Sequence, residues 1–120
     1  MKSRRSAQNL PIAVKRRMSG RQRVALSLPA RIGRKDATII DASRGSARVR
    51  HAGAIDVGTQ VIVAFQSFYG PFSGTAEVAS CRVVGTSPDG STEFESLVRF
   101  GSLPPEAKEI LAKVVADDNE

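Results

Sequence analysis

Six short strand-like segments, most with apolar residues alternating with polar ones, constrain the fold of this chain more than any other feature of its sequence. In the first segment, apolar residues occupy every second position: Val24, Leu26, Leu28, Ala30 and Ile32. A period of two places these side chains on one face of a β-strand. Pro29 lies inside this run and cannot donate a hydrogen bond to a neighbouring strand, so it predicts an edge position or a bulge.

The other five segments lie at residues 38–41, 47–51, 61–65, 73–84 and 94–100. Each stretch between successive segments contains glycine or proline, which predicts a turn or a loop. Six strands at short spacing predict an all-β domain, either a small antiparallel barrel or a sandwich. Closing the sheet into a barrel would remove the exposed strand edges that favour aggregation.

After the last of these segments, the apolar spacing becomes that of a helix. One stripe is formed by Ala107, Ile110, Leu111, Val114 and Val115. Pro104 and Pro105 suit a first helical turn, and Ser102 is placed to cap it. Asp117 would oppose the helix dipole at the C-terminal end, so we expect the helix to end near Ala116 and to pack on the sheet.

The charge is unevenly distributed along the chain. The formal net charge is +6, yet the first 35 residues contain eleven basic residues and no acidic one. Such a positive segment indicates an anionic partner: a nucleotide, a nucleic acid, a membrane surface or an acidic protein. We therefore divide the chain into a flexible basic arm (1–15), one domain that begins with a linker and ends with the helix (16–116), and an acidic tail (117–120).

Several classes of protein are disfavoured. No apolar segment has the length that a secretory signal or a membrane span of ~20 residues requires, and the lone Cys81 cannot form an internal disulfide, so we expect a cytoplasmic protein. Asp41, Ser43 and His51 include the residue types of a catalytic triad, but no nucleophile-elbow sequence accompanies them. One histidine and one cysteine do not make a metal site. We therefore predict a protein that is not an enzyme and holds no metal or cofactor.

Two groups of residues carry chemistry that indicates a ligand. The basic segment contains Arg16, Arg17, Arg21 and Arg23. A guanidinium group donates two parallel hydrogen bonds to a phosphate or to O6 and N7 of guanine, which lysine cannot do. Further along the chain, Asp41 and Ser43 stand at a strand end, where a carboxylate could accept from guanine N–H groups and a hydroxyl could bind a phosphate. The same pair is also typical of a turn held by side chains.

The segments that contain these groups resemble the PilZ domain family. Residues 17–24, followed by Leu28-Pro29-Ala30, are similar to the opening of that domain, and residues 41–49 are similar to its second motif. The resemblance covers residues 16–100. It implies an all-β fold, a six-stranded antiparallel barrel with a C-terminal α-helix. It also implies binding of cyclic di-GMP, a bacterial second messenger.

Many members of that family bind the nucleotide through an RxxxR motif in the N-terminal linker and a [DN]xSxxG motif on the barrel. Arg17 and Arg21 match the first motif, and Asp41 and Ser43 match the first two positions of the second. Ser46 stands where the second motif has its final glycine. The chain therefore departs from the family pattern at one position.

Together, the chemistry and the resemblance predict a receptor or adaptor that binds cyclic di-GMP and signals to a downstream protein partner by ordering its arginine linker over the barrel. The candidate ligand-binding residues are Arg16, Arg17, Arg21, Arg23, Asp41, Ser43 and Ser46. Two alternatives stay open: a PilZ-like interaction module that binds no nucleotide, and a nucleic-acid-binding barrel. The second is less favoured because the chain lacks the interleaved aromatic residues that stack on single-stranded bases.

Overall fold

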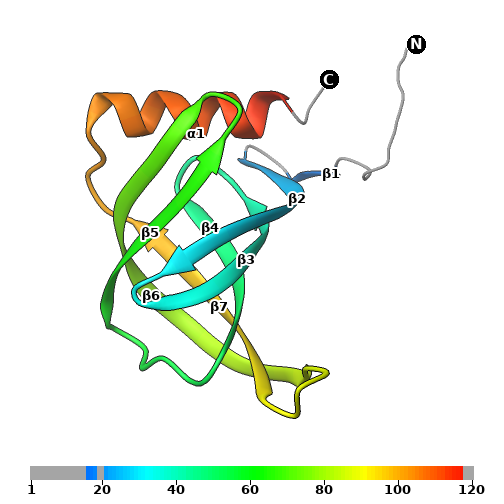
Figure 1. Ribbon diagram of the computed structural model, residues 1–120. Coiled ribbons are helices and arrows are strands. Elements are labelled where there is room, and N and C mark those ends of the chain that lie inside the picture. The colour runs from blue at the N-terminus through cyan, green and yellow to red at the C-terminus, as the bar shows by residue number, and fades with distance from the viewer. Residues whose placement is uncertain (1–15, 19–20, 118–120) are drawn as a thin grey trace.

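The computed structural model describes residues 16–18 and 21–117, with side chains from residue 23 to residue 116. In this part of the chain, seven strands precede one helix (Figure 1). The strands are β1 (Arg16–Met18), β2 (Arg21–Ile32), β3 (Lys35–Ala42), β4 (Ser46–Ala52), β5 (Gln60–Ser67), β6 (Gly70–Thr86) and β7 (Thr92–Phe100), and the helix is α1 (Pro105–Asp117). The predicted class, a mostly antiparallel β domain with a C-terminal helix, is confirmed.

All strand pairings are antiparallel, and they connect six of the strands in a closed ring. The order of the sheet is β1-β2-β3-β4-β7-β6-β5, and β2 also pairs with β5. The pairing of β2 with both β3 and β5 joins the two ends of the series. Each strand from β2 to β7 therefore has a hydrogen-bonded neighbour on both sides over part of its length, which protects its edges.

Strand β2 has the alternation that its sequence predicts. Val24 and Ile32 are buried, whereas Ala25 and Arg31 are exposed. The register with β3 shifts between Ala25 and Leu28, and Pro29 pairs with Thr38 of β3, while the pairing with β5 begins only at the next residue. Pro29 thus has a strand neighbour on one side, which agrees with the predicted edge position because proline has no N–H to donate.

Two segments differ from the predictions. Residues 16–22 were expected to form a linker, but β1 pairs with the start of β2, and residues 19 and 20 lie outside the described part of the chain. Residues 70–71 were expected to interrupt the chain, but they begin β6, and the turn lies before them. Gly70 has a φ of 118°, a conformation that favours glycine, and Pro71 pairs with Gln66 of β5. Proline is tolerated there because β7 joins β6 only from Ala76 onward.

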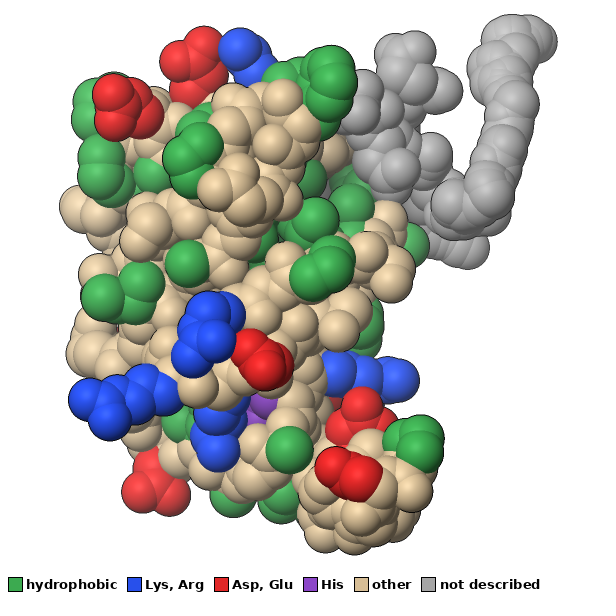
Figure 2. All heavy atoms as spheres, viewed as in Figure 1, with side chains coloured by type: hydrophobic (Ala, Val, Ile, Leu, Met, Phe, Trp, Pro, Cys, Tyr) green, Lys and Arg blue, Asp and Glu red, His purple; other side chains and the backbone are tan. Residues whose placement is uncertain are grey.

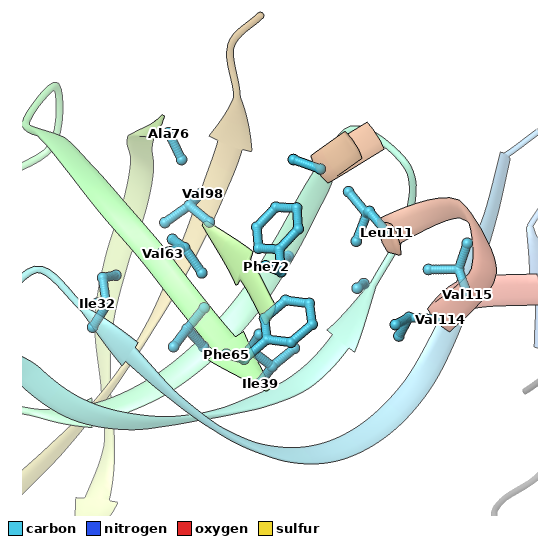
Figure 3. Close-up of a cluster of buried hydrophobic side chains, with 14 of the residues drawn as sticks. Ile32, Ile39, Val63, Phe65, Phe72, Ala76, Val98, Leu111, Val114 and Val115 are labelled. Atoms are coloured by element: carbon cyan, nitrogen blue, oxygen red, sulfur yellow. The ribbon is translucent and has the colours of Figure 1, made fainter. Parts of the chain in front are cut away.

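The core lies inside the ring of strands and beneath α1 (Figure 3). Phe72 is 1% exposed, stacks on Phe65 with 4.7 Å between ring centroids, and meets the edge of Phe100 at 5.5 Å. Gly74 lies close to this group, because a Cβ atom there would stand 3.0 Å from Phe72 Cζ, and also 2.5 Å from Leu103 Cδ2. The predicted helical stripe completes the cluster through Ala107, Leu111, Val114 and Val115, which are all buried.

The ends of α1 differ slightly from the predicted ones. The first helical hydrogen bond is donated by the N–H of Lys108 to the carbonyl of Pro104 over 3.0 Å. Pro104 therefore occupies the cap position, and the prediction that Ser102 caps the helix was wrong by two residues. The helix ends at Asp117, one residue beyond the predicted end at Ala116 and at the first residue of the predicted acidic tail. Such differences are common because helix ends fray.

The surface carries side chains of several kinds. Figure 2 shows hydrophobic side chains over much of one face, with basic and acidic side chains at its upper edge and interspersed among them in its lower half. Among the described residues, no helix has the length and hydropathy to cross a membrane, and no three acidic, histidine or cysteine side chains are grouped to hold a metal ion. Cys81 is a free, partly buried cysteine that packs against the core.

Candidate functional site

The candidate residues meet on the outer side of the sheet, where β2, β3 and β4 lie side by side. Ala42 of β3 pairs with Val24 of β2 on one side and with Ala47 of β4 on the other, and all three are buried in the core. Because side chains alternate along a strand, the residues next to this row project outward. Arg23, Asp41 and Ser46 are such neighbours, so the inward row of small apolar residues positions an outward row of polar ones.

Irregular pairing adjusts the direction of Asp41. The register of β3 shifts on both sides of the sheet: against β2 between Ala25 and Leu28, and against β4 between Ile39 and Asp41. Such irregularities increase the local twist and redirect side chains. Beyond these shifts, Asp41 pairs with Ala25 on one side and Arg48 on the other. Two basic side chains thereby come within reach of one carboxylate.

Arg23 contacts all three of the other described candidates. Its Nε–H and Nη2–H groups both donate to Asp41 Oδ1, over 3.0 and 2.8 Å. Its Nη1 donates to Ser46 Oγ over 2.6 Å and lies 3.5 Å from Ser43 Oγ. The side chains of Arg23 and Asp41 are only 17% and 20% exposed, so this is a largely covered, charge-assisted contact.

The two serines hold the turn between β3 and β4. The N–H of Ser43 donates to the carbonyl of Ser46 over 2.8 Å, and the N–H of Gly45 donates to Ser43 Oγ over 3.3 Å. The hydroxyl oxygens of Ser43 and Ser46 are 3.2 Å apart. Ser43 is 4% exposed. The turn interpretation of the motif is therefore confirmed, and the two hydroxyls also face the guanidinium of Arg23.

A chain of charges extends from Asp41 toward β6. Arg48 Nη1 donates to Asp41 Oδ2 over 3.3 Å, and Arg48 Nε lies 3.7 Å from Glu95 Oε2. Arg50 and Arg82 also approach Glu95, whose side chain is 9% exposed. With Arg23, four guanidinium groups surround two carboxylates on the outer side of the sheet. We call this surface the outer wall, and these groups give it an excess of positive charge. None of Arg48, Arg50, Arg82 and Glu95 was among the site residues predicted from the sequence.

The arginine segment, residues 16–22, continues into β2 beside the outer wall, and the structure describes the backbone of its residues 16–18 and 21–22. In the β1–β2 pairing, the backbone of Arg16 is opposite that of Arg23. The backbones of Arg17 and Arg21 belong to β1 and β2. The side chains of Arg16, Arg17 and Arg21 lie outside the described part of the structure. Of the seven predicted site residues, the structure therefore brings together the side chains of Arg23, Asp41, Ser43 and Ser46.

His51 lies apart from this site and has a structural role. It is 3% exposed and stacks on Phe94 with 6.3 Å between ring centroids. Its Nδ1–H donates to the carbonyl of Gly53 over 3.0 Å, which leaves Nε2 to accept from Ser96 Oγ over 2.7 Å. Its hydroxyl partner is thus Ser96 and not Ser43, so the geometry contradicts a triad. Burial lowers the pKa of His51 below its usual 6.5.

This lowered pKa predicts a loss of stability in mild acid. Because the folded state has the lower pKa, the unfolded chain takes up the proton first as pH falls. The free energy of unfolding is therefore greatest above pH 6.5 and declines as pH falls through 6.5 toward the lowered value. Urea titrations between about pH 7.5 and pH 5.5 would measure the decline.

A matched variant tests the origin of this pH dependence. His51 is the only histidine of the chain, so no other side chain has an ordinary pKa in this interval. In the variant His51→Gln, we expect a lower but nearly constant free energy of unfolding over the same pH range. A wild-type stability that does not change between these pH values would contradict the prediction.

Comparison with known proteins supports the fold. No family model matches the sequence, and no curated protein matches it significantly. Among solved structures, the chain is similar to the PilZ domain with c-di-GMP of YcgR from Escherichia coli, with a TM-score of 0.63 and 16% sequence identity. The similarity covers 83% of this chain and 90% of that chain. At this identity the comparison establishes the fold alone: the chain has a PilZ-like fold.

Proposed function

We propose that this chain is a PilZ-type receptor or adaptor domain that binds cyclic di-GMP. The observation that carries the proposal is the meeting of Arg23 with Asp41, Ser43 and Ser46 on one outer wall. These residues come from both segments that resemble the motifs of the family. The c-di-GMP in the structure of the YcgR domain supports the choice of ligand.

Each proposed residue has a role that follows from its chemistry. Arg16, Arg17 and Arg21 bind the two phosphodiester groups and the O6 and N7 edges of the guanines. Asp41 accepts hydrogen bonds from the N1–H and N2–H groups of one guanine. The excess of arginine along β4 and β6 attracts the doubly negative ligand.

The serines bind a phosphate or an amide of the ligand. Ser46 stands at the glycine position of the family motif. Its hydroxyl, which Arg23 contacts, donates a hydrogen bond to the ligand or accepts one from it at the edge of the site. Ser43 fixes the turn that presents Asp41. In this proposal the departure from the motif adds a polar group to the site.

The proposed mode of action is a change in the arginine segment. Binding fixes the arginine segment, in which β1 already pairs with the start of β2, against the ring of strands, which acts as the barrel of the PilZ fold. The combined surface of segment, nucleotide and barrel is then read by a downstream protein. The chain carries no catalytic constellation in this proposal, and it acts only through binding.

The direct test is a titration with cyclic di-GMP. Because the ligand binds the folded state, a concentration of about 100 times the dissociation constant should add about 2.7 kcal/mol to the free energy of unfolding. For a domain of this size, the melting temperature should rise by several degrees. Calorimetric titration would measure the affinity, and differential scanning would measure the shift.

Two controls separate the alternatives. A random-sequence oligonucleotide should produce no shift at physiological salt, whereas a salt-dependent shift with the oligonucleotide alone would favour a nucleic-acid-binding domain. If micromolar cyclic di-GMP gives neither heat nor a thermal shift, the receptor proposal fails. The chain is then better described as a PilZ-like interaction module without a nucleotide.

A further inference from the structure

We infer that Arg23 occupies the place on Asp41 that a guanine base would take, so the nucleotide has to displace an internal competitor in order to bind. This inference rests on the proposed function, because it concerns the same carboxylate. It assigns Arg23 a role opposite to that of a ligand-binding arginine. Removal of its side chain should strengthen binding.

Arg23 and a guanine base present hydrogen-bond donors in the same arrangement. Arg23 presents two N–H groups, on Nε and Nη2, that flank the central carbon of a guanidinium, and both donate to Asp41 Oδ1. The N1–H and N2–H groups of guanine flank a carbon in the same way, because guanine contains a guanidine unit. Both groups need the same acceptor in the same geometry.

Among the described residues, Arg23 and Arg48 use three of the about four acceptor sites of the Asp41 carboxylate, so no adjacent pair of sites is left for a base. Oδ1 accepts both donors of Arg23, and Oδ2 accepts from Arg48 over 3.3 Å. The side chain of Asp41 is 20% exposed. A guanine edge can therefore reach Asp41 only where Arg23 or Arg48 leaves, and Arg23 offers the matching pair of donors.

When the side chain of Arg23 is displaced from Asp41, it still has a hydrogen-bond partner. Its Nη1 already contacts Ser46 Oγ, and the backbone at Arg23 pairs with that at Arg16 in β1. Release of the side chain from Asp41 therefore changes the contacts of the residue whose backbone pairs with Arg16 of β1. Competition at one carboxylate thus links nucleotide binding to the segment that the proposed function requires to move.

The competition favours guanine over other bases. A ligand regains the energy of the lost Arg23 contact only if it provides two adjacent donors to the carboxylate. The Watson–Crick edge of adenine has one donor group beside an acceptor nitrogen, which would face Asp41 unfavourably. Arg23 therefore covers Asp41 against every base, and a base that cannot replace both of its hydrogen bonds does not recover the free energy of the displacement.

The test compares Arg23→Ala with Arg31→Ala by calorimetric titration with cyclic di-GMP and cyclic di-AMP. Arg31 pairs with Asp36 near the β2–β3 turn and is 56% exposed, so its removal makes the same change of charge away from the site. We expect Arg23→Ala to bind cyclic di-GMP roughly tenfold more tightly than the wild type, the scale of one charge-assisted hydrogen bond. Both proteins should bind cyclic di-AMP more weakly than cyclic di-GMP, because adenine cannot replace both hydrogen bonds to Asp41, and Arg31→Ala should bind cyclic di-GMP like the wild type within a factor of about two.

The outcomes distinguish this inference from the proposed function. If the wild type binds cyclic di-GMP and Arg23→Ala binds it equally or less tightly, the inference is overturned and the proposed function stands. If neither protein binds cyclic di-GMP, both are overturned. If Arg23→Ala binds cyclic di-AMP as tightly as cyclic di-GMP, no guanine edge contacts Asp41, and the displacement of Arg23 by guanine is overturned.

A second measurement does not depend on how well the variant folds. In wild-type protein labelled with ¹⁵N, the Nε–H of Arg23 should give a protected signal without nucleotide, because it donates to a largely covered carboxylate. Saturation with cyclic di-GMP should shift or abolish that signal. An unchanged Arg23 Nε–H signal in the saturated protein would overturn the displacement.

Discussion

Replacement of Asp41 by alanine is expected to weaken the binding of cyclic di-GMP by roughly tenfold, because one bidentate contact to a base is worth about 1–3 kcal/mol and the variant no longer requires the displacement of Arg23, which offsets part of that loss. Asp41 is the only carboxylate that contacts Arg23 among the described residues. In the variant, Arg23 and Arg48 lose their shared acceptor, and the guanine loses the group that reads its N–H donors. Calorimetric titration would measure the change.

The matched control for this variant is Asp36→Ala. Asp36 also pairs with an arginine, over 3.0 Å, but its side chain is 93% exposed and lies near the β2–β3 turn. Both variants make the same change in net charge, so a purely electrostatic effect would strengthen the binding of an anionic ligand in both. We expect Asp36→Ala to bind like the wild type. An Asp41→Ala affinity within threefold of the wild type would contradict the assigned role.

Replacement of Phe72 by alanine is expected to lower the free energy of unfolding by about 3–5 kcal/mol, the usual cost of removing a buried aromatic side chain. Phe72 is 1% exposed and contacts Phe65 and Phe100 through its ring (Figure 3). Its removal opens a cavity between the strands and α1. Because small domains are stable by only about 5–15 kcal/mol, much of the stability would be lost.

The control for this variant is Phe68→Ala. Phe68 precedes β6 and is 94% exposed, so the same chemical change removes few buried contacts. We expect a change within about 0.5 kcal/mol. Urea titrations of both variants would give the midpoints and slopes from which these values follow. A loss below 1 kcal/mol for Phe72→Ala would mean that the cluster rearranges to fill the cavity.

Part of the candidate site could be predicted from the sequence. Asp41 and Ser43 stand at a strand end in a recognisable spacing, and the structure places both beside Arg23. The contribution of Glu95 had no such signal. Its contacts with Arg50 and Arg82 depend on which residues of β4, β6 and β7 face one another, and the register of β6 with β7 shifts between Val78 and Ser80. A shift of one residue reverses the face of every later side chain, so local pattern alone could not identify these pairs.

The arginine segment shows a second limit. Polar composition around Arg16 and Arg21 indicated a linker, whereas the structure pairs β1 with the start of β2. Three-residue strands carry too little periodicity to be read from a sequence, and their pairing depends on the neighbour that is available. The start of β6 at Gly70 was not anticipated either, because it also depends on neighbouring strands. Gly70 is tolerated in the strand because glycine can adopt a positive φ, and Pro71 is tolerated because β7 does not yet pair with β6 there.

Apart from β1 and the start of β6, the sequence by itself determined which segments are strands, which of their faces are apolar, and where the helix lies. These properties follow from periodicity along a single segment, because side chains alternate in a strand and recur about every 3.6 residues in a helix. Only the tertiary structure decided that β2 pairs with both β3 and β5, and that Arg23 meets Asp41 eighteen positions away. Strand register and long-range ion pairs depend on contacts between distant segments, and the free energy of those contacts is set by the whole packed sheet and not by any one stretch of residues.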